Sequence, residues 1–230
     1  YPIYELIIQD DCSTDNTIEI IQEYASKYKF IKPYKNKKNI GFNKNFKEAI
    51  LKATGDYIAI SDQDDIWYKD KLKIQLDIIG KHSLCTSSYH KDTKYEVGSM
   101  KNIITPTNSF EYQLFTNSIP GHTMLIDKEF VQNIFTNWSI HIIYDWWIVI
   151  NAYLSNGIIC VNTPLNWHRP HSNSAITLEF KERNKSFAIK PSWQPYIYGY
   201  KHYRKLQQLP VWTSLYTYIV NKTNYPPVYN

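Results

Sequence analysis

The sequence predicts an α/β fold in which a mostly parallel sheet carries helices on both faces. Over residues 4–80, short apolar or β-branched runs alternate three times with segments whose apolar residues recur at helical spacing. This alternation is typical of parallel strands joined by right-handed crossovers. Acidic residues follow two of the expected strands, at ends that a parallel sheet brings to one edge. A ligand site is therefore expected at that edge.

The expected elements of this first part follow from periodicity and from turn residues. Asn16 and Glu19 resemble a capping box, Asn39–Gly41 reads as a turn, and Gly55 and Gly80 are expected to end helices. In chain order, we expect a strand at 4–8, a helix at 16–28, a strand at 30–34, a helix from 42 to Gly55, a strand at 57–60 and a helix at 67–79.

Beyond residue 80 the pattern is less regular, and two domains are expected, at 1–175 and 176–230. The second is an aromatic and basic extension that we expect to be helical. Its helices either pack on the first domain or lie at a membrane surface. The remaining expected elements are a strand at 84–89, a loop at 91–107, a helix at 110–115, a strand within 120–126, a helix from Tyr144 to Gly157 and a strand at 158–161.

Composition excludes several classes of protein. Of the 230 residues, 43% are apolar, and no apolar run approaches the ~20 residues of a membrane-spanning helix. The three cysteines are widely spaced, which disfavours a disulfide framework or a metal knuckle and, without a signal peptide, favours a cytoplasmic location. Lysines dominate 27–52 and basic residues dominate 181–210, which suits phosphate-bearing ligands, but no nucleic-acid-binding motif accompanies them.

The segment GDYIAISDQDDIW carries the first candidate site. Its apolar strand delivers Asp62, Asp64 and Asp65 into the following loop. Carboxylates placed this closely repel one another, and hard divalent ions such as Mg²⁺ and Mn²⁺ bind one or two of them together with phosphate oxygens. The other interpretation is an acidic turn that caps the helix expected near Trp67. There is no G-x-G-x-x-G or P-loop, so a dinucleotide fold and a P-loop site are disfavoured.

The stretches ELIIQDDCSTDNT and NIGFNKNFKEAILKATGDYIAISDQDDIW, in this order, resemble family 2 glycosyltransferases with the GT-A fold, and in particular the bacterial rhamnosyltransferase-like branch. The resemblance implies transfer of a sugar from a nucleoside diphosphate, with Mg²⁺ or Mn²⁺ at the diphosphate. Members of the family normally carry a further strand, loop and helix before the segment that resembles residues 4–10. Without them, part of the base-binding pocket would be missing.

Two later segments resemble motifs of the same family. Tyr144-Asp145-Trp146-Trp147 is similar to its His-Asp-Trp-Trp motif, which implies that Asp145 is the catalytic base. From the residues alone, an aspartate at a helix start is either a cap or, beside two tryptophans, a carboxylate of raised pKa. The stretch 164–173 is similar to the Tyr-Arg-x-His-x-Asn stretch, which implies a metal contact for His171. His122 is either an acceptor-facing residue or a packed histidine.

The resemblance and the residues together predict a metal-dependent, inverting glycosyltransferase. Asp145 is expected to be the base. Metal ligands are expected at Asp64, with Asp62 and His171 in support. The nucleotide-sugar donor, dTDP- or UDP-linked, is expected to contact Asp10, Asp11, Lys44, Asp62, Gln63 and Arg169.

The expected acceptor is a glycan or a polyprenyl-linked sugar of bacterial surface polysaccharide synthesis, which favours the inner face of the plasma membrane as the place of work, with peripheral membrane contact. The alternative is a non-catalytic module of the same fold that binds nucleotide sugars or glycans.

Overall fold

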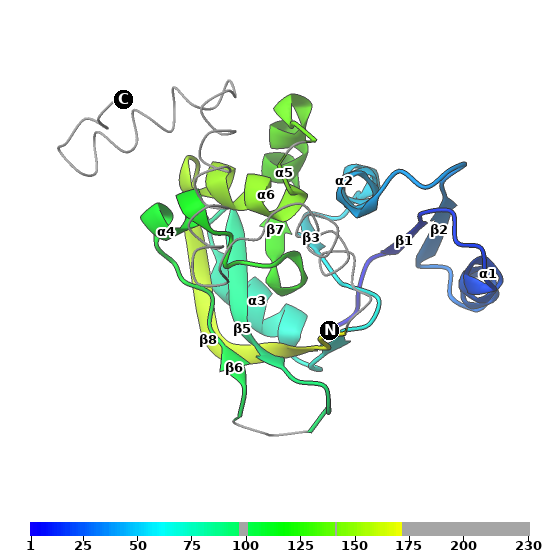
Figure 1. Cartoon of the computed structure of the whole chain (residues 1–230), viewed down its shortest axis with the longest axis horizontal. Helices are drawn as coiled ribbons and strands as arrows, with labels where there is room; N and C mark the ends of the chain where they lie inside the picture. The colour runs from blue at the N-terminus through cyan, green and yellow to red at the C-terminus, as the bar shows by residue number, and fades with distance from the viewer. Residues whose placement is uncertain (97–100, 141, 172–230) are drawn as a thin grey trace, which may run out of the picture.

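The computed structural model of the chain describes residues 1–96, 101–140 and 142–171 (Figure 1). The extension expected at 176–230 lies outside the described residues, so the division into two domains stays a prediction. None of the helices in the described part is both long and apolar enough to cross a membrane.

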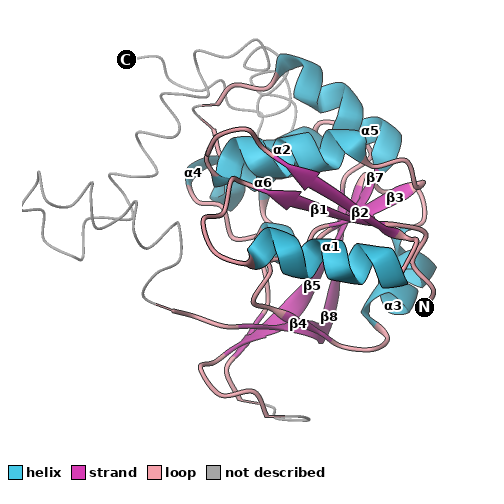
Figure 2. Cartoon of the chain, turned by 90° about the vertical axis from the view of Figure 1, so that its right-hand side faces the viewer, coloured by secondary structure: helices cyan, strands magenta, loops and turns pink. Residues whose placement is uncertain are grey.

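The first strands form a small parallel sheet. Strand β1 (Leu6–Asp10) pairs with β2 (Ile31–Lys35), and helix α1 (Thr17–Lys27) makes the crossover between them. Helix α2 (Phe42–Lys52) contacts β1, so that α1 and α2 flank the two strands (Figure 2). Helix α2 ends at Ala53 rather than at Gly55, because Ala53 is extended and closes the helix through its N–H bond to Ile50.

A second sheet of six strands carries the rest of the described fold. Its strand order is β3-β7-β5-β8-β4, and β6 pairs with β5. Only β5 and β8 pair in parallel; the other pairs are antiparallel, so this sheet is mixed rather than mostly parallel. The bounds are β3 (Tyr57–Ala59), β4 (Ile66–Trp67), β5 (Leu84–Lys91), β6 (Ile103–Ile104), β7 (Leu125–Asp127) and β8 (Ile158–His168).

The two sheets are joined by side chains and by α2. Among the described residues no backbone ladder links β1 to β3, in contrast to the single sheet expected over 4–80. The Glu5 carboxylate accepts hydrogen bonds from Thr54 N at 2.6 Å and Gly55 N at 3.3 Å. Asn45 on α2 donates its side-chain amide to Gln9 O at 2.8 Å. The Glu5 bonds tie the start of β1 to the turn before β3, and the Asn45 bond ties the end of β1 to α2.

Helices cover both faces of the second sheet. Helix α3 (Lys71–Ile79) packs on one face, where the buried residues include Cys85 and Leu125. Their neighbours Leu84 and Ile126 point to the opposite face, as alternation along a strand requires. The helical segments that follow α3 are α4 (Phe110–Phe115), η1 (Gly121–Thr123), α5 (Lys128–Ile134), η2 (Phe135–Asn137) and α6 (Tyr144–Tyr153).

The third helix begins later than expected. Trp67, where the sequence places its start, pairs with Asn166 of β8, and Ile66 pairs with Trp167, so the helix begins only at Lys71. Gly80 ends it with φ of 51°, as expected from its conformational freedom. The strand expected at 158–161 continues to His168. Together, β4 and the longer β8 bring the acidic loop beside the end of β8.

Candidate active site

Two of the predicted metal ligands lie against each other. His171 Nε2 is 2.8 Å from Asp64 Oδ2, and the two side chains are 39% and 22% exposed. A carboxylate oxygen and an imidazole nitrogen at this distance, open to solvent on one side, suit a divalent ion that also binds phosphate oxygens. The donor set therefore fits the metal that the sequence predicts. The assignment of the ligands themselves stays a prediction.

Asp62 lies deeper in the same loop. Burial, and next the negative charge of Asp65, raise the pKa of Asp62 to about 6. Because the charged form of this carboxylate is disfavoured, a cation beside it would stabilise that form strongly. This electrostatic environment supports the predicted supporting role of Asp62 at the metal.

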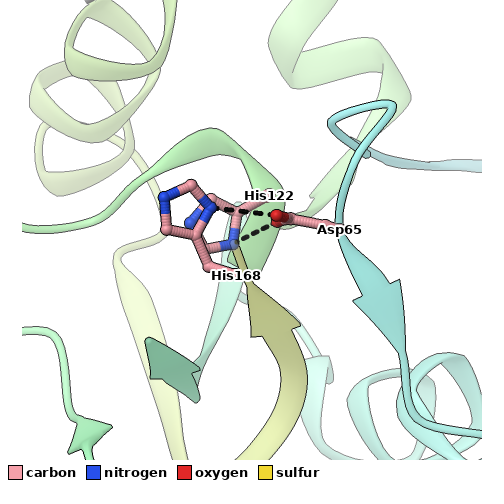
Figure 3. A group of neighbouring side chains, drawn as sticks. All are labelled: Asp65, His122 and His168. Carbon is pink, nitrogen blue, oxygen red and sulfur yellow. Dashed lines mark hydrogen bonds and ion pairs between the residues drawn. The ribbon is translucent and has the colours of Figure 1, made fainter. Parts of the chain in front are cut away.

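Asp65 is a buried carboxylate that contacts two histidines (Figure 3). Its side chain is fully buried; Oδ1 is 2.9 Å from His168 Nδ1, and Oδ2 is 3.3 Å from His122 Nδ1. The two imidazole rings stack with centroids 4.8 Å apart and planes 5° apart. Asp65 is therefore no helix cap, because the residues after it form β4 and Asp70 holds the N-cap position of α3.

The two histidines differ in their electrostatics. Burial, and next the neighbouring His168, lower the pKa of His122 to about 3, so His122 stays neutral. The hydrogen bond to Asp65 raises the pKa of His168 above its ordinary value. Of the two interpretations of His122 from sequence, the structure favours the packed histidine, since its ring is 4% exposed and its Nδ1 is turned to Asp65.

Asp145 lies in the first turn of α6 and is half-buried. Its Oδ1 accepts a hydrogen bond from Trp146 N at 2.7 Å, which lowers its pKa, as does the Gly121 N–H. Burial outweighs both bonds and, with a smaller contribution from the charge of Asp62, raises the pKa of Asp145 to about 7. Asp145 is not the N-cap of α6, which is Ile143, although its carboxylate bonds an N–H of the first turn. Its raised pKa agrees with the other interpretation from sequence, and its role as the base stays a prediction.

Gly121 holds η1 against the start of α6. A Cβ at this position would lie 2.2 Å from the Tyr144 hydroxyl and 3.0 Å from the ring carbon that bears it. Tyr144 has little room to yield, because it is 4% exposed and stacks on Phe46 with centroids 4.6 Å apart. The absence of a side chain at residue 121 thus permits the contact that brings its N–H to Asp145.

Gly121→Ala is accordingly expected to destabilise the protein by about 1–3 kcal/mol, the usual range for overpacking a core. Thermal unfolding measures the effect. The matched control is Gly55→Ala, where the nearest atoms to a Cβ are at an ordinary 3.7 Å. Equal melting temperatures for the two variants would contradict the tight packing of Tyr144 on Gly121.

The carboxylates after β1 already have partners within the chain. Buried Asp10 accepts from Ser13 N at 3.2 Å and from the Ser13 hydroxyl. Asp11 accepts from Ile40 N at 2.8 Å and Gly41 N at 2.9 Å, and thereby anchors the turn before α2. Oδ1 of each carboxylate accepts two hydrogen bonds, whereas Oδ2 accepts one and keeps a lone pair, so a nucleoside contact stays a prediction for both residues. In the structure, both carboxylates also hold nearby backbone N–H groups in place.

The remaining predicted donor contacts are exposed. Lys44 projects from the first turn of α2, and Gln63 lies between the two predicted metal-binding aspartates. The Arg169 guanidinium lies over the Trp167 ring, 5.1 Å from its centroid. In this conformation Arg169 is engaged with an aromatic face, so its contact with phosphate stays a prediction.

Sequence reasoning missed the cluster of Asp65, His122 and His168. The three residues supply ligand-type atoms that all lie within 4.8 Å of one another. Their convergence depends on the pairing of β4 with β8, in which Ile66 faces Trp167. Extending that antiparallel register by one step places Asp65 opposite His168. The two-residue strand that sets this register carries no clear signal of its own.

The comparison with protein-family models identifies the family of the chain. The family model described as "Glycosyl transferase family 2" matches residues 1–151. The chain belongs to glycosyltransferase family 2. The match includes β1, the acidic loop and most of α6, so the sequence-based recognition of the family and of the GT-A fold is confirmed.

Curated relatives agree with this assignment. The chain is 32% identical over 204 residues to a protein named dTDP-rhamnosyl transferase RfbG from Shigella flexneri, covering 80% of this chain and 69% of the relative. It is 34% identical over 132 residues to a putative teichuronic acid biosynthesis glycosyltransferase, TuaG, from Bacillus subtilis, covering 56% and 52%. The chain thus spans between half and about two thirds of these relatives.

Solved structures share the fold at low sequence identity. The S. aureus TarS 1–349 structure in complex with UDP-GlcNAc has a TM-score of 0.57 at 19% identity and covers 90% of this chain and 72% of that chain. The mannosyltransferase PcManGT from Pyrobaculum calidifontis, in complex with GDP-Man and Mn²⁺, has a TM-score of 0.54 at 13% identity, covering 97% and 72%. These similarities support the fold of the glycosyltransferase.

Proposed function

We propose that this glycosyltransferase transfers a sugar, rhamnose or a hexose, from a dTDP- or UDP-linked donor to a glycan or polyprenyl-linked acceptor, with inversion at the anomeric carbon. One observation carries the proposal: a carboxylate of near-neutral pKa, Asp145, shares a site with the ligand pair Asp64 and His171. Asp62 links the two electrostatically, because its charge acts on Asp145 and its own loop carries Asp64.

Asp145 is the group that takes the proton. Its carboxylate removes the proton of the acceptor hydroxyl as that oxygen forms a bond to the anomeric carbon. The bond from this carbon to the diphosphate oxygen breaks on the opposite side, so the electron pair leaves with the nucleoside diphosphate and the configuration inverts. Asp145 is suited to this task because a pKa of about 7 combines a substantial deprotonated fraction with useful basicity at neutral pH.

Asp64 and His171, with Asp62 in support, would hold Mg²⁺ or Mn²⁺. The bound ion supplies Lewis-acid stabilisation of the charge on the departing diphosphate. Asp10 and Asp11 would orient the base and ribose from the loop after β1. Lys44 and Arg169 are the cations that would meet the phosphates.

The relatives favour particular substrates. RfbG is named as a dTDP-rhamnosyl transferase and TuaG as an enzyme of teichuronic acid biosynthesis, which supports a rhamnose or hexose donor and an acceptor in bacterial surface polysaccharide synthesis. The complexes of TarS with UDP-GlcNAc and of PcManGT with GDP-Man and Mn²⁺ support a nucleotide-sugar donor and a divalent ion. A cytoplasmic site of action at a membrane face belongs to the same proposal.

The decisive experiment measures release of nucleoside diphosphate from a panel of dTDP- and UDP-sugars with Mn²⁺, with and without lipid-linked acceptors. We expect one donor to be turned over faster than the others and the acceptor to increase the rate. Donor binding without turnover, for every donor and acceptor, would instead support the non-catalytic binding module.

A further inference from the structure

The buried cluster of Asp65, His122 and His168 lies between two parts of the candidate site, and the proposed reaction gives it no role. On one side, His168 at the end of β8 contacts Asp65 at 2.9 Å, and His171 follows three residues later. On the other side, His122 contacts Asp65 at 3.3 Å, and the N–H of its neighbour Gly121 bonds the Asp145 carboxylate. A single carboxylate therefore connects the strand end that carries His171 with the turn that contacts Asp145.

We propose that Asp65 is a positioning residue whose bonds to His168 and His122 set the geometry of the Asp64–His171 pair and its distance from Asp145. This inference rests on the proposed function, because it gives the cluster a task at the same site. Asp65 itself touches neither metal nor substrate in the proposal. It acts through the backbone, since Asp64 is its direct neighbour.

The register of the short strand β4 makes such a contact effective. The pair Ile66–Trp167 is the last backbone pair before the loop, and Asp65 and His168 occupy the next position on each chain. The bond between their side chains continues the pairing by one step beyond the ladder. Without it, the acidic loop and the residues after β8 would separate beyond Trp167, and Asp64 would lose its fixed position relative to His171.

The hydrogen bonds of His122 support the same role. Its Nδ1 is 3.3 Å from Asp65 Oδ2 and 2.8 Å from the Asn166 side-chain amide. Asp65 Oδ2 and Asn166 Oδ1 are both buried and lack another hydrogen-bond partner in the described part of the chain. A proton on His122 Nδ1, with the Asn166 amide turned so that its oxygen faces the ring, can be shared by the two oxygens in one three-centre hydrogen bond. His122 then donates to Asp65 as a neutral imidazole.

The charge of Asp65 also has a buried counterpart. Lys71 is 1% exposed and donates a hydrogen bond to His122 O at 3.2 Å; burial lowers its pKa to about 7, and the charge of Asp65 opposes this shift. A buried carboxylate is tolerated only when such partners surround it, and removing one of them leaves an uncompensated charge. Asp65, His122 and Lys71 are thus connected in the interior, as a positioning role requires.

The test compares Mn²⁺ binding to the full chain in the presence of UDP or dTDP, by titration calorimetry, for the wild type and five variants, one of which, His171→Ala, removes a predicted ligand. Asp65→Asn and His168→Ala are each expected to weaken Mn²⁺ binding by about 10–100-fold, the usual effect of removing a group that orients a metal ligand. His168→Asn is expected to restore most of the affinity, because its amide nitrogen takes the place of Nδ1. The control is Asp77→Asn, an exposed carboxylate on α3.

The outcomes separate this inference from the proposed function. Wild-type affinity in Asp65→Asn, or no difference between His168→Asn and His168→Ala, would overturn the positioning role alone. Absence of Mn²⁺ binding by the wild type would overturn both proposals. An ion that survives His171→Ala and is lost in Asp65→Asn would show that the cluster ligates metal itself, and would also overturn the inference. If Asp65→Asn fails to fold, the two His168 variants decide.

Discussion

Asp145→Asn is expected to lower kcat by about 10²–10⁴-fold, the usual contribution of a general base. The amide keeps the shape of the side chain but cannot take the proton of the acceptor hydroxyl. Affinity for the nucleoside diphosphate should stay at the wild-type value, since Asp145 acts on the acceptor. Transfer rates and calorimetric binding of UDP or dTDP provide the two measurements, with Asp77→Asn as the control. Transfer near the wild-type rate would remove Asp145 from the role of base.

The pH dependence gives a second signature of the same residue. Burial raises the pKa of Asp145 to about 7, and the base works only when deprotonated. The value of kcat/KM should therefore fall as pH drops through about 7, by tenfold per pH unit below it. The residual activity of Asp145→Asn should lack this limb. A limb near the ordinary aspartate value of about 4 would indicate a solvated carboxylate instead.

Removal of divalent ions is the second change with a large expected effect. Excess EDTA should weaken binding of the nucleotide-sugar donor by about 10²-fold or more, because without the ion the diphosphate would face the carboxylates of Asp62 and Asp64 with no positive charge between them. Calorimetry with and without Mn²⁺ measures the loss of affinity. Adding Mn²⁺ in excess of EDTA should restore donor binding by the wild-type protein.

Asp64→Ala should reproduce the loss in the presence of Mn²⁺, because the variant lacks one of the two contacting ligand groups. The control Asp77→Asn should bind donor normally. Donor affinity that is unchanged by EDTA would take the ion out of donor binding.

Much of the fold could be predicted because its signals are local. Apolar periodicity predicts α1, α2 and α6, and the order of the motifs identifies the family that the family model also matches. Asp64 and His171 were both named as ligands, and the structure brings them together. Only the resemblance indicates that these two residues lie close together, since no local sequence pattern connects a strand-end loop to a residue after β8.

The incorrect or missing expectations have a non-local cause. The sheet was expected to be mostly parallel, but β7 lies between β3 and β5 and runs against both. A helix is expected to begin at Trp67, but Ile66 and Trp67 form the strand β4 because they pair with the backbone of β8. Asp65 was interpreted as a cap for the same reason. Tertiary pairing overrode local propensity at each of these places.

The separation of β1 and β2 from the larger sheet has a consequence for local stability. The two strands bond each other, and α1, which covers them, contains no buried residue. Such a unit opens at a lower free energy than the core around α6, where seven residues are buried. Asp10 and the loop of Asp11 belong to the unit that opens more easily, whereas Asp145 lies in the first turn of α6, within the more buried core. The nucleotide recognition and the proton transfer that we propose would thus take place in regions of unequal local stability, and part of the donor's binding energy is expected to be used to order the first of them.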